Sequence, residues 1–170
     1  ILTGDAVPVP AVFEGGGATT GVALECRGGA LSGQKTFVDY GHFATHHVVA
    51  AAGDAGAGLY LADASAPGVQ CEPLRSIGRT PVCNVRYQGV DAERIADADA
   101  LEALVRLGRA LAAVQCVGAM QQALDMTVAY ANVREQFGTT ISTFQAVRHH
   151  CANMSIRVAS ARVLAYEALD

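Results

Sequence analysis

The sequence predicts an α+β fold: an antiparallel β sandwich or barrel, residues 1–96, followed by a long antiparallel helical hairpin of a helix bundle, residues 97–170. All five prolines, at positions 8, 10, 67, 73 and 81, lie before residue 90, together with most of the glycines. From Asp99 onward there is no proline, and glycine occurs only at positions 108, 118 and 138. Short runs between turn residues are typical of strands, whereas a long segment without proline favours helix.

The first half contains short β-branched runs separated by turn residues, and we expect these runs to form the strands of an all-β unit. One stretch, residues 28–36, is close to a phosphate-binding loop. Gln34 separates Gly33 from Lys35, however, and a β run follows in place of a helix, so a hairpin turn is the better interpretation. The predicted strands are residues 21–26, 31–40, 47–52, 58–62, 69–75 and 81–87.

The second half predicts two helices, residues 99–137 and 141–169, joined by a tight turn around Gly138. The first would be close to ~60 Å long at 1.5 Å per residue, which implies a bundle or a long interface. Asp97, Asp99 and Glu102 precede or open it, where acidic side chains favour capping. The second carries an apolar stripe at alternating spacings of three and four, typical of a helix that packs along one face. Its members are Phe144, Val147, Cys151, Met154, Val158, Ala161 and Ala165.

Composition excludes several classes of function. The chain has 170 residues, of which 51% are hydrophobic and 16% charged, and its net charge is −4, so nucleic acid is not an expected partner. We expect no membrane span and a cytoplasmic location, because charges or glutamines interrupt the apolar stretches. Five widely spaced cysteines and two pairs of adjacent histidines offer no metal-ligand spacing. Because the sequence begins without methionine and ends inside a helical pattern, we expect a longer protein.

The polar stretch "ANVREQFGTTISTFQAV", residues 131–147, lies at the expected turn between the helices. Gly138 as a helix stop explains the turn. The positive charge of Arg134 in the last helical turn would interact favourably with the negative end of the helix dipole. Neither effect explains why Gln136 and Phe137 accompany that arginine, or why Gln145 follows one turn into the next helix.

The chain resembles the acyl-CoA dehydrogenase family, over the middle β domain and the first half of the C-terminal helical domain. The resemblance is carried by "LSGQKTFV" at 31–38, "PGVQ" at 67–70, "YANVREQFG" at 130–138 and "FQAV" at 144–147. It implies that Arg134 reaches the pyrophosphate of an FAD bound largely by the neighbouring subunit. Guanidinium groups form charge-assisted, often paired hydrogen bonds to phosphate. The resemblance further implies that Gln136, Phe137 and Gln145 contact the same cofactor, and that Arg109, Tyr130, Ala131, Asn132 and Val133 line the acyl-CoA pocket.

The activity implied by this resemblance is α,β-dehydrogenation of an acyl-CoA thioester, in which a carboxylate removes the α proton and FAD accepts the β hydride. Electrons would then pass to an electron-transfer flavoprotein. The implied assembly is a homo- or hetero-oligomer with a homologous subunit, most simply a tetramer. An oxidase or a flavin monooxygenase on the same scaffold is an alternative that the sequence does not separate from a dehydrogenase.

Three departures from the family pattern concern the flavin and the catalytic base. Where members carry an aromatic residue and then a serine or threonine beside the flavin ring, this chain has Phe37, Val38 and Asp39. The N-terminal flavin loop is scarcely recognisable in residues 1–12, and Gly108 occupies a position that carries the catalytic glutamate in some members. No catalytic residue is therefore assigned. These departures favour a degenerate subunit of a heteromeric enzyme, like those of actinobacterial sterol breakdown, or else a structural partner without its own FAD that stabilises a catalytic homologue.

Overall fold

The computed structural model describes residues 4–15 and 22–169. The chain separates into two compact units, residues 1–105 and 106–170, and the division falls within the long first helix. The first unit holds the seven-stranded sheet and the first turns of that helix. The second holds the rest of the helix and everything that follows it. Each unit is described by itself.

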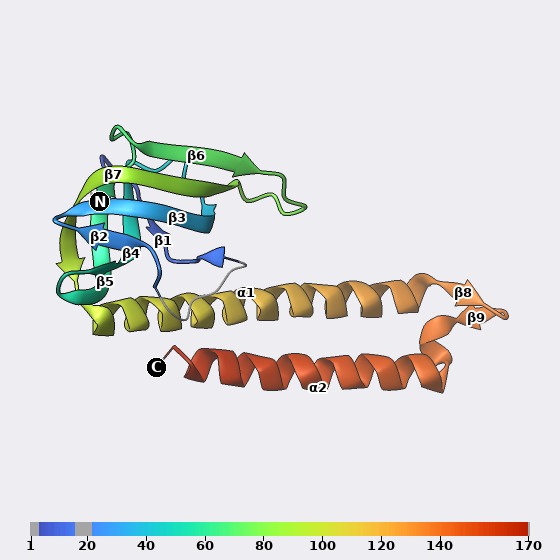
Figure 1. Ribbon diagram of the computed structural model, residues 1–170. Helices are drawn as coiled ribbons and strands as arrows, with labels where there is room; N and C mark the ends of the chain where they lie inside the picture. The colour runs from blue at the N-terminus through green and yellow to red at the C-terminus, as the bar shows by residue number, and fades with distance from the viewer. Residues whose placement is uncertain (1–3, 16–21, 170) are drawn as a thin grey trace. The chain divides into compact units, whose positions relative to one another are not determined.

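The first unit is a β barrel, which confirms the predicted all-β half (Figure 1). Hydrogen bonding runs from β4 through β2, β3 and β7 to β5, and β5 pairs with β4 again, so that the path closes. β1 is attached to β4, and β6 to β7. The strands of the described residues in this unit are β1 (Pro8–Ala11), β2 (Glu25–Arg27), β3 (Ala30–Asp39), β4 (His46–Gly53), β5 (Gly56–Asp63), β6 (Val69–Leu74) and β7 (Val82–Ala96).

Four of the predicted strands match β3 to β6 closely, while the others require correction. The strand predicted over 21–26 begins only at Glu25, and its first position, 21, lies outside the described residues. The strand predicted over 81–87 continues to Ala96, because Gly89, with a φ of 63°, lies at a shift in the β3–β7 register and pairing resumes beyond it. The hairpin expected within residues 28–36 is present, since Arg27 pairs with Ala30 across a two-glycine turn.

Strand β1 was not predicted, because its two prolines read as turn residues. An edge strand tolerates proline, since one row of its N–H groups has no partner in the sheet. Pairing of β1 with β4 is parallel, as is pairing of β2 with β4, whereas the other pairings of the barrel are antiparallel. Alternation of apolar and polar residues does not carry strand direction, so the sequence could not predict these two parallel pairs.

The core of the barrel is formed by alternate residues of its strands. Leu31 and Val38 of β3, Val49 of β4 and Val85 and Tyr87 of β7 are all almost completely buried. A smaller apolar cluster joins Ala50 of β4 and Leu59 of β5 to Leu101, in the first turns of the long helix. The barrel therefore closes on its own core and anchors the start of this helix.

The two antiparallel helices that the sequence predicts are α1 (Ala98–Val133), most of which lies in the second unit, and α2 (Gln145–Glu167) (Figure 1). Every residue of the apolar stripe from Phe144 to Ala165 is buried or half-buried, which confirms that this face of α2 packs inward. On α1 the buried residues of this unit recur every seven positions, as Ala110, Val117, Leu124 and Ala131. This period matches the seam of two packed helices. Arg162 of α2 donates to Gln121 Oε1 of α1 at 2.6 Å across the pair.

Helix bounds at the turn differ from the prediction. α1 ends at Val133, so the expectation of helix to residue 137 was wrong: Glu135–Gln136 forms a strand, β8, paired with β9 (Thr139–Thr140). A short 3-10 helix, η2 (Ile141–Thr143), replaces the predicted start of the second helix. Gln145 is consequently the first residue of α2 and does not lie one turn into it. The polar sequence from Glu135 to Thr143 can form a hairpin ladder of its own, and that pairing competes with continued helix.

The start of α1 agrees with the expected capping. The carboxylate of Asp97 accepts a hydrogen bond from the backbone N–H of Ala100 at 3.1 Å, the geometry of an N-cap. By length and composition alone α1 could also cross a membrane, contrary to the expectation drawn from the sequence. A long helix in a bundle has the same length and apolar character.

Candidate functional site

The turn that carries the predicted cofactor ligands is a two-residue β hairpin at the tip of the helical hairpin. Phe137 and Gly138 have φ values of 55° and 78°, and Gln136 pairs with Thr139 on either side of them. Two successive residues with positive φ between paired strands are the pattern of a type I′ turn. Phenylalanine is unusual there, because the left-handed conformation is unfavourable for residues with a bulky side chain.

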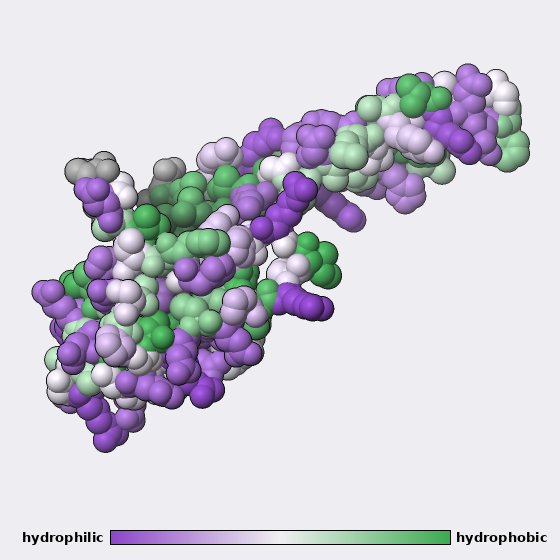
Figure 2. Space-filling model, turned by 90° about the horizontal axis from the view of Figure 1, so that it is seen from above, coloured by the Kyte–Doolittle hydropathy of each residue, from purple (hydrophilic) through white to green (hydrophobic). Residues whose placement is uncertain are grey.

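Phe137 is held where it cannot contribute to the core of this chain. The residue is 95% exposed, and its ring lies edge-on to the ring of Phe144, at 6.2 Å between centroids and 81° between planes. Figure 2 shows hydrophobic residues among hydrophilic ones at the surface of the tip of the helical hairpin. Strain combined with exposure at one aromatic residue points to a role in binding another molecule.

Arg134 is fixed through its backbone while its side chain remains at the surface. Its N–H donates to Tyr130 O at 2.9 Å, which completes the last turn of α1, and its carbonyl accepts from Ile141 N at 2.8 Å. Within residues 4–15 and 22–169 the structure forms no ion pair with its guanidinium. The group therefore presents a full set of donors to solvent, as a ligand for phosphate or carboxylate must.

The two glutamines of the predicted set are also exposed, but they differ in what they contact. Gln136 Nε2 donates to the carbonyl of Glu135 at 2.7 Å, so its side chain lies along the hairpin. Gln145 lies at the first position of α2, with Phe144 as the N-cap residue, and that helix end has no side-chain cap. Arg134, Gln136 and Phe137 are brought onto one hairpin, and Gln145 follows at the adjoining helix end.

The residues predicted to line an acyl-CoA pocket do not form one group. Ala131 is buried between the helices, while Tyr130 and Val133 are largely exposed. Ala131 and Asn132 line a cavity of about 330 Å³ together with Ser142, Val147, Arg148 and Cys151. Arg109 lies far along α1 from these residues, on an exposed position. The cavity is lined mainly by apolar groups, with Asn132, Ser142 and Arg148 supplying polar ones.

In the barrel, the residues at the family's flavin-ring position fit a bound flavin poorly. Phe37 has a φ of 53° and is 50% exposed, at a register shift between Lys35 and Val38. Asp39 follows at the end of β3 with an exposed carboxylate. A carboxylate beside the ring would repel the anionic reduced flavin and cannot donate a hydrogen bond when ionised. When ionised, the Asp39 side chain therefore does not supply the hydrogen-bond donor that a serine or threonine would offer at this position.

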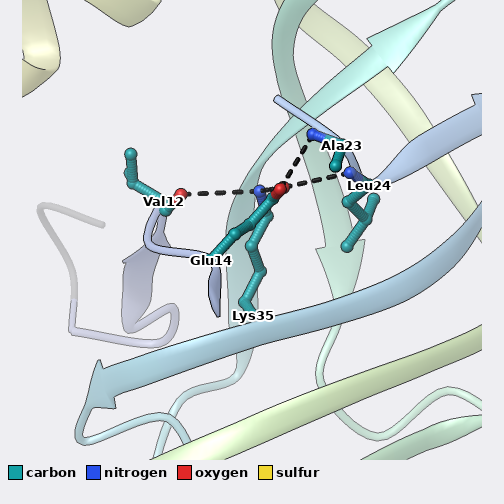
Figure 3. A network of polar contacts seen from close by, with 5 residues as sticks. All are labelled: Val12, Glu14, Ala23, Leu24 and Lys35. Atoms are coloured by element: carbon teal, nitrogen blue, oxygen red, sulfur yellow. Dashed lines mark hydrogen bonds and ion pairs between the residues drawn. The ribbon is translucent and has the colours of Figure 1, made fainter. Parts of the chain in front are cut away.

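A buried ion pair in the barrel was missed by the sequence reasoning (Figure 3). Lys35 is completely buried and donates to Glu14 Oε1 and, at 3.5 Å, to the carbonyl of Val12. Glu14 also accepts from the N–H groups of Ala23 and Leu24, at 2.8 and 3.0 Å. Burial alone would raise the pKa of Glu14, but the hydrogen bonds from Lys35, Leu24 and Ala23 outweigh it and lower that pKa. Nothing in the spacing of Glu14 and Lys35 signals this pair.

A second buried network was also missed, inside the barrel. His47 Nε2 contacts the carbonyl of Gly41 at 2.8 Å, and Tyr87 Oη contacts His47 Nδ1 at 3.0 Å. The carbonyl can only accept, so Nε2 carries the proton and Nδ1 accepts from the tyrosine hydroxyl. Burial lowers the pKa of His47, against the raising effect of its bond to Gly41. The described residues contain no cluster of three or more His, Cys, Asp or Glu side chains that could hold a metal ion.

The barrel, the long helical hairpin and the R-E-Q-F-G tip are the features expected of an acyl-CoA dehydrogenase. Residues 98–170 match the acyl-CoA dehydrogenase C-terminal domain. The chain belongs to the acyl-CoA dehydrogenase family.

Among its relatives is the acyl-CoA dehydrogenase FadE27 of Mycobacterium tuberculosis, which is 35% identical over 136 residues, covering 78% of this chain and 36% of FadE27. A variant of the Tcur3481-Tcur3483 steroid ACAD superposes with a TM-score of 0.89 at 33% identity, over 98% of this chain and 47% of that one. The ChsE4-ChsE5 complex from Mycobacterium tuberculosis gives a TM-score of 0.83 at 30% identity, over 98% and 47%. This chain thus spans about half, or less, of the proteins it matches.

Proposed function

We propose that this chain is a subunit of a flavin-dependent acyl-CoA dehydrogenase, and that its 134–138 turn binds an FAD held mainly by a neighbouring homologous subunit. The observation that carries this proposal is that one hairpin holds the Arg134 guanidinium, which forms no ion pair with the described residues, beside the exposed, strained aromatic ring of Phe137. FAD offers a pyrophosphate for the first and planar rings for the second. The two side chains therefore match the two kinds of group that FAD presents.

Each side chain would have a separate task in the assembled enzyme. Arg134 would hold pyrophosphate oxygens, and Gln136 and Gln145 would donate to or accept from neighbouring parts of the cofactor. Bound FAD supplies the hydride acceptor of an α,β-dehydrogenation of an acyl-CoA thioester. None of these residues is a proton acceptor for the substrate, so the catalytic carboxylate would come from elsewhere in the assembly.

A heteromeric assembly is favoured by the contrast between the two parts of the chain. The tip residues offer a guanidinium and an aromatic ring that suit an FAD, whereas the strained Phe37 and the acidic Asp39 suit a flavin ring on this chain's own barrel less well. Two of its structural relatives are a steroid ACAD with two named components and the ChsE4-ChsE5 complex. The second candidate function is a non-catalytic partner subunit, without its own FAD, that stabilises a catalytic homologue.

The proposal is tested by flavin absorbance of the full-length protein, purified alone and together with a homologous subunit. Colour only in the complex supports an FAD shared with a different homologous subunit, and colour in the protein alone supports a flavin site formed by copies of this chain. Absence of flavin from both preparations, after incubation with FAD, contradicts the proposal.

The role of Arg134 is tested by its substitution in that complex. Removing a charged donor from a partly buried phosphate costs on the order of 2 to 5 kcal/mol, so Arg134→Ala should weaken FAD binding well over tenfold. Arg134→Lys should recover part of the loss, because an ammonium cannot reproduce the guanidinium fork. Arg157→Ala is the control, because Arg157 is an exposed arginine of α2 outside the turn, and its loss should leave FAD affinity unchanged. Unchanged FAD affinity in both Arg134 variants would show that the arginine serves only the helix end.

A further inference from the structure

Short polar contacts connect the β8–β9 hairpin to the start of α2. Arg148 Nε donates to the carbonyl of Ser142 at 2.8 Å. The hydroxyls of Ser142 and Thr140 are 3.1 Å apart, and Thr143 Oγ1 donates to the carbonyl of Thr140 at 2.7 Å. Polar groups of residues 140–143 thus bond to one another, and Arg148 connects Ser142 to the body of α2.

We propose that Arg148 is a positioning residue, which holds the 134–138 turn in the orientation that presents Arg134 and Phe137 to the flavin. This inference rests on the proposed function of the turn. Arg148 itself need not touch the cofactor, since its Nε is directed to Ser142. Its effect would pass through the backbone from Ser142 to the hairpin.

The structure provides a continuous path for that effect. Ser142 lies in η2, whose first residue, Ile141, donates its N–H to the carbonyl of Arg134 at 2.8 Å. Thr140 pairs with Glu135 in the β8–β9 ladder, one residue from Arg134. Fixing the carbonyl of Ser142 therefore restricts the backbone of Arg134 by way of Ile141 and Thr140, the two residues that precede Ser142.

The hairpin needs such a support, because its own ladder is minimal. β8 and β9 have two residues each, and an isolated two-stranded hairpin is marginally stable in water. The turn also holds Phe137 in the left-handed region, with a φ of 55°. A strained conformation of this kind persists only where surrounding contacts determine it. Contacts from Arg148 and the three hydroxyl residues are placed to do this.

Two substitutions separate the hydrogen bond of Arg148 from its charge. In Arg148→Gln, the amide Nε2 occupies the position along the side chain that Nε has in arginine, so a donor to Ser142 is kept while the charge is lost. In Arg148→Met, a side chain of similar length has neither donor nor charge. A positioning role predicts that these two variants differ, whereas an electrostatic role predicts that they are alike.

The experiment measures two quantities in the complex with the homologous subunit. One is hydrogen exchange of the Ile141 and Phe144 amides in the flavin-free complex, and the other is FAD affinity. Loss of one hydrogen bond should speed exchange, and weaken FAD binding, by about threefold to tenfold in Arg148→Met. Arg148→Gln should stay within about twofold of the wild type on both measures. Arg157→Met, an equal change of charge on the same helix, should alter neither.

The outcomes distinguish this inference from the proposed function. If Arg148→Met leaves exchange unchanged, or if the Gln and Met variants behave alike, Arg148 does not position the turn, even where Arg134→Ala abolishes FAD binding. If Arg134→Ala has no effect on FAD, the proposed function fails and the flavin part of this inference fails with it. Exchange at Ile141 then still decides whether Arg148 holds the hairpin.

Discussion

Replacement of Glu14 by glutamine should destabilise the barrel far more than an ordinary loss of one surface charge. The Lys35 side chain is 0% exposed, and Glu14 is its charged partner. In Glu14→Gln the ammonium would keep only a neutral amide oxygen and the distant carbonyl of Val12. Breaking a buried pair by removing one partner costs about 3 to 5 kcal/mol. We expect the lower end, about 3 kcal/mol, because burial already lowers the pKa of Lys35 and it can lose its proton.

The reverse substitution should cost less, because Glu14 has other partners. In Lys35→Met the carboxylate keeps its hydrogen bonds from Ala23 and Leu24 and remains partly exposed, so the expected loss is about 1 to 2 kcal/mol. The double variant should be less destabilised than the sum of the single ones, by about 1 to 3 kcal/mol of coupling. Combined removal leaves no buried charge without a partner.

Urea denaturation of the full-length protein at pH 7, followed by far-ultraviolet circular dichroism and tyrosine fluorescence, measures these free energies. Glu25→Gln is the matched control, since Glu25 pairs with Arg27 at 2.9 Å on the surface, where an ion pair contributes little. The reasoning is refuted if Glu14→Gln costs no more than Glu25→Gln, or if the double-mutant cycle gives no coupling.

Three further predictions concern pH, the helix start and the helix pair. His47 is buried, and its pKa lies below its ordinary value near 6.5. As pH falls, this histidine therefore gains a proton in the unfolded chain before it does so in the folded protein, so stability should decrease below about pH 6.5. Urea midpoints between pH 8 and 5 should fall less steeply for His47→Gln than for the wild type, and an equal slope would contradict this. Asp97→Ala should lower the free energy of unfolding by about 1 kcal/mol, and Asp97→Ser by much less, as measured by thermal melts. Val158→Ala should cost about 2 kcal/mol because Val158 is 4% exposed, whereas Val163→Ala, at a 59% exposed position of the same helix, should change stability little.

Parts of the candidate site could be predicted because their signals are local. Arg134, Gln136 and Phe137 precede a glycine, and a turn brings consecutive residues together whatever the rest of the chain does. The acidic residue at the flavin-ring position could also be predicted, since Asp39 follows Phe37 closely in one strand. The hydrogen bond from Arg148 to Ser142, by contrast, could not be predicted. It joins residues six positions apart and depends on η2, a short 3-10 helix that helical periodicity does not distinguish from the first turn of an α-helix.

By itself, the sequence determined the division into a β half and a helical half, the apolar stripe of α2 and the residues at the turn. Each of these rests on spacing along the chain, which backbone geometry converts directly into a face, a strand or a turn. Tertiary structure alone decided that the barrel closes through β4 and β5, that β1 and β2 run parallel to β4, and that Lys35 is buried against Glu14. Those features join residues distant in sequence, and their energies depend on desolvation and pairing that appear only once the strands have come together.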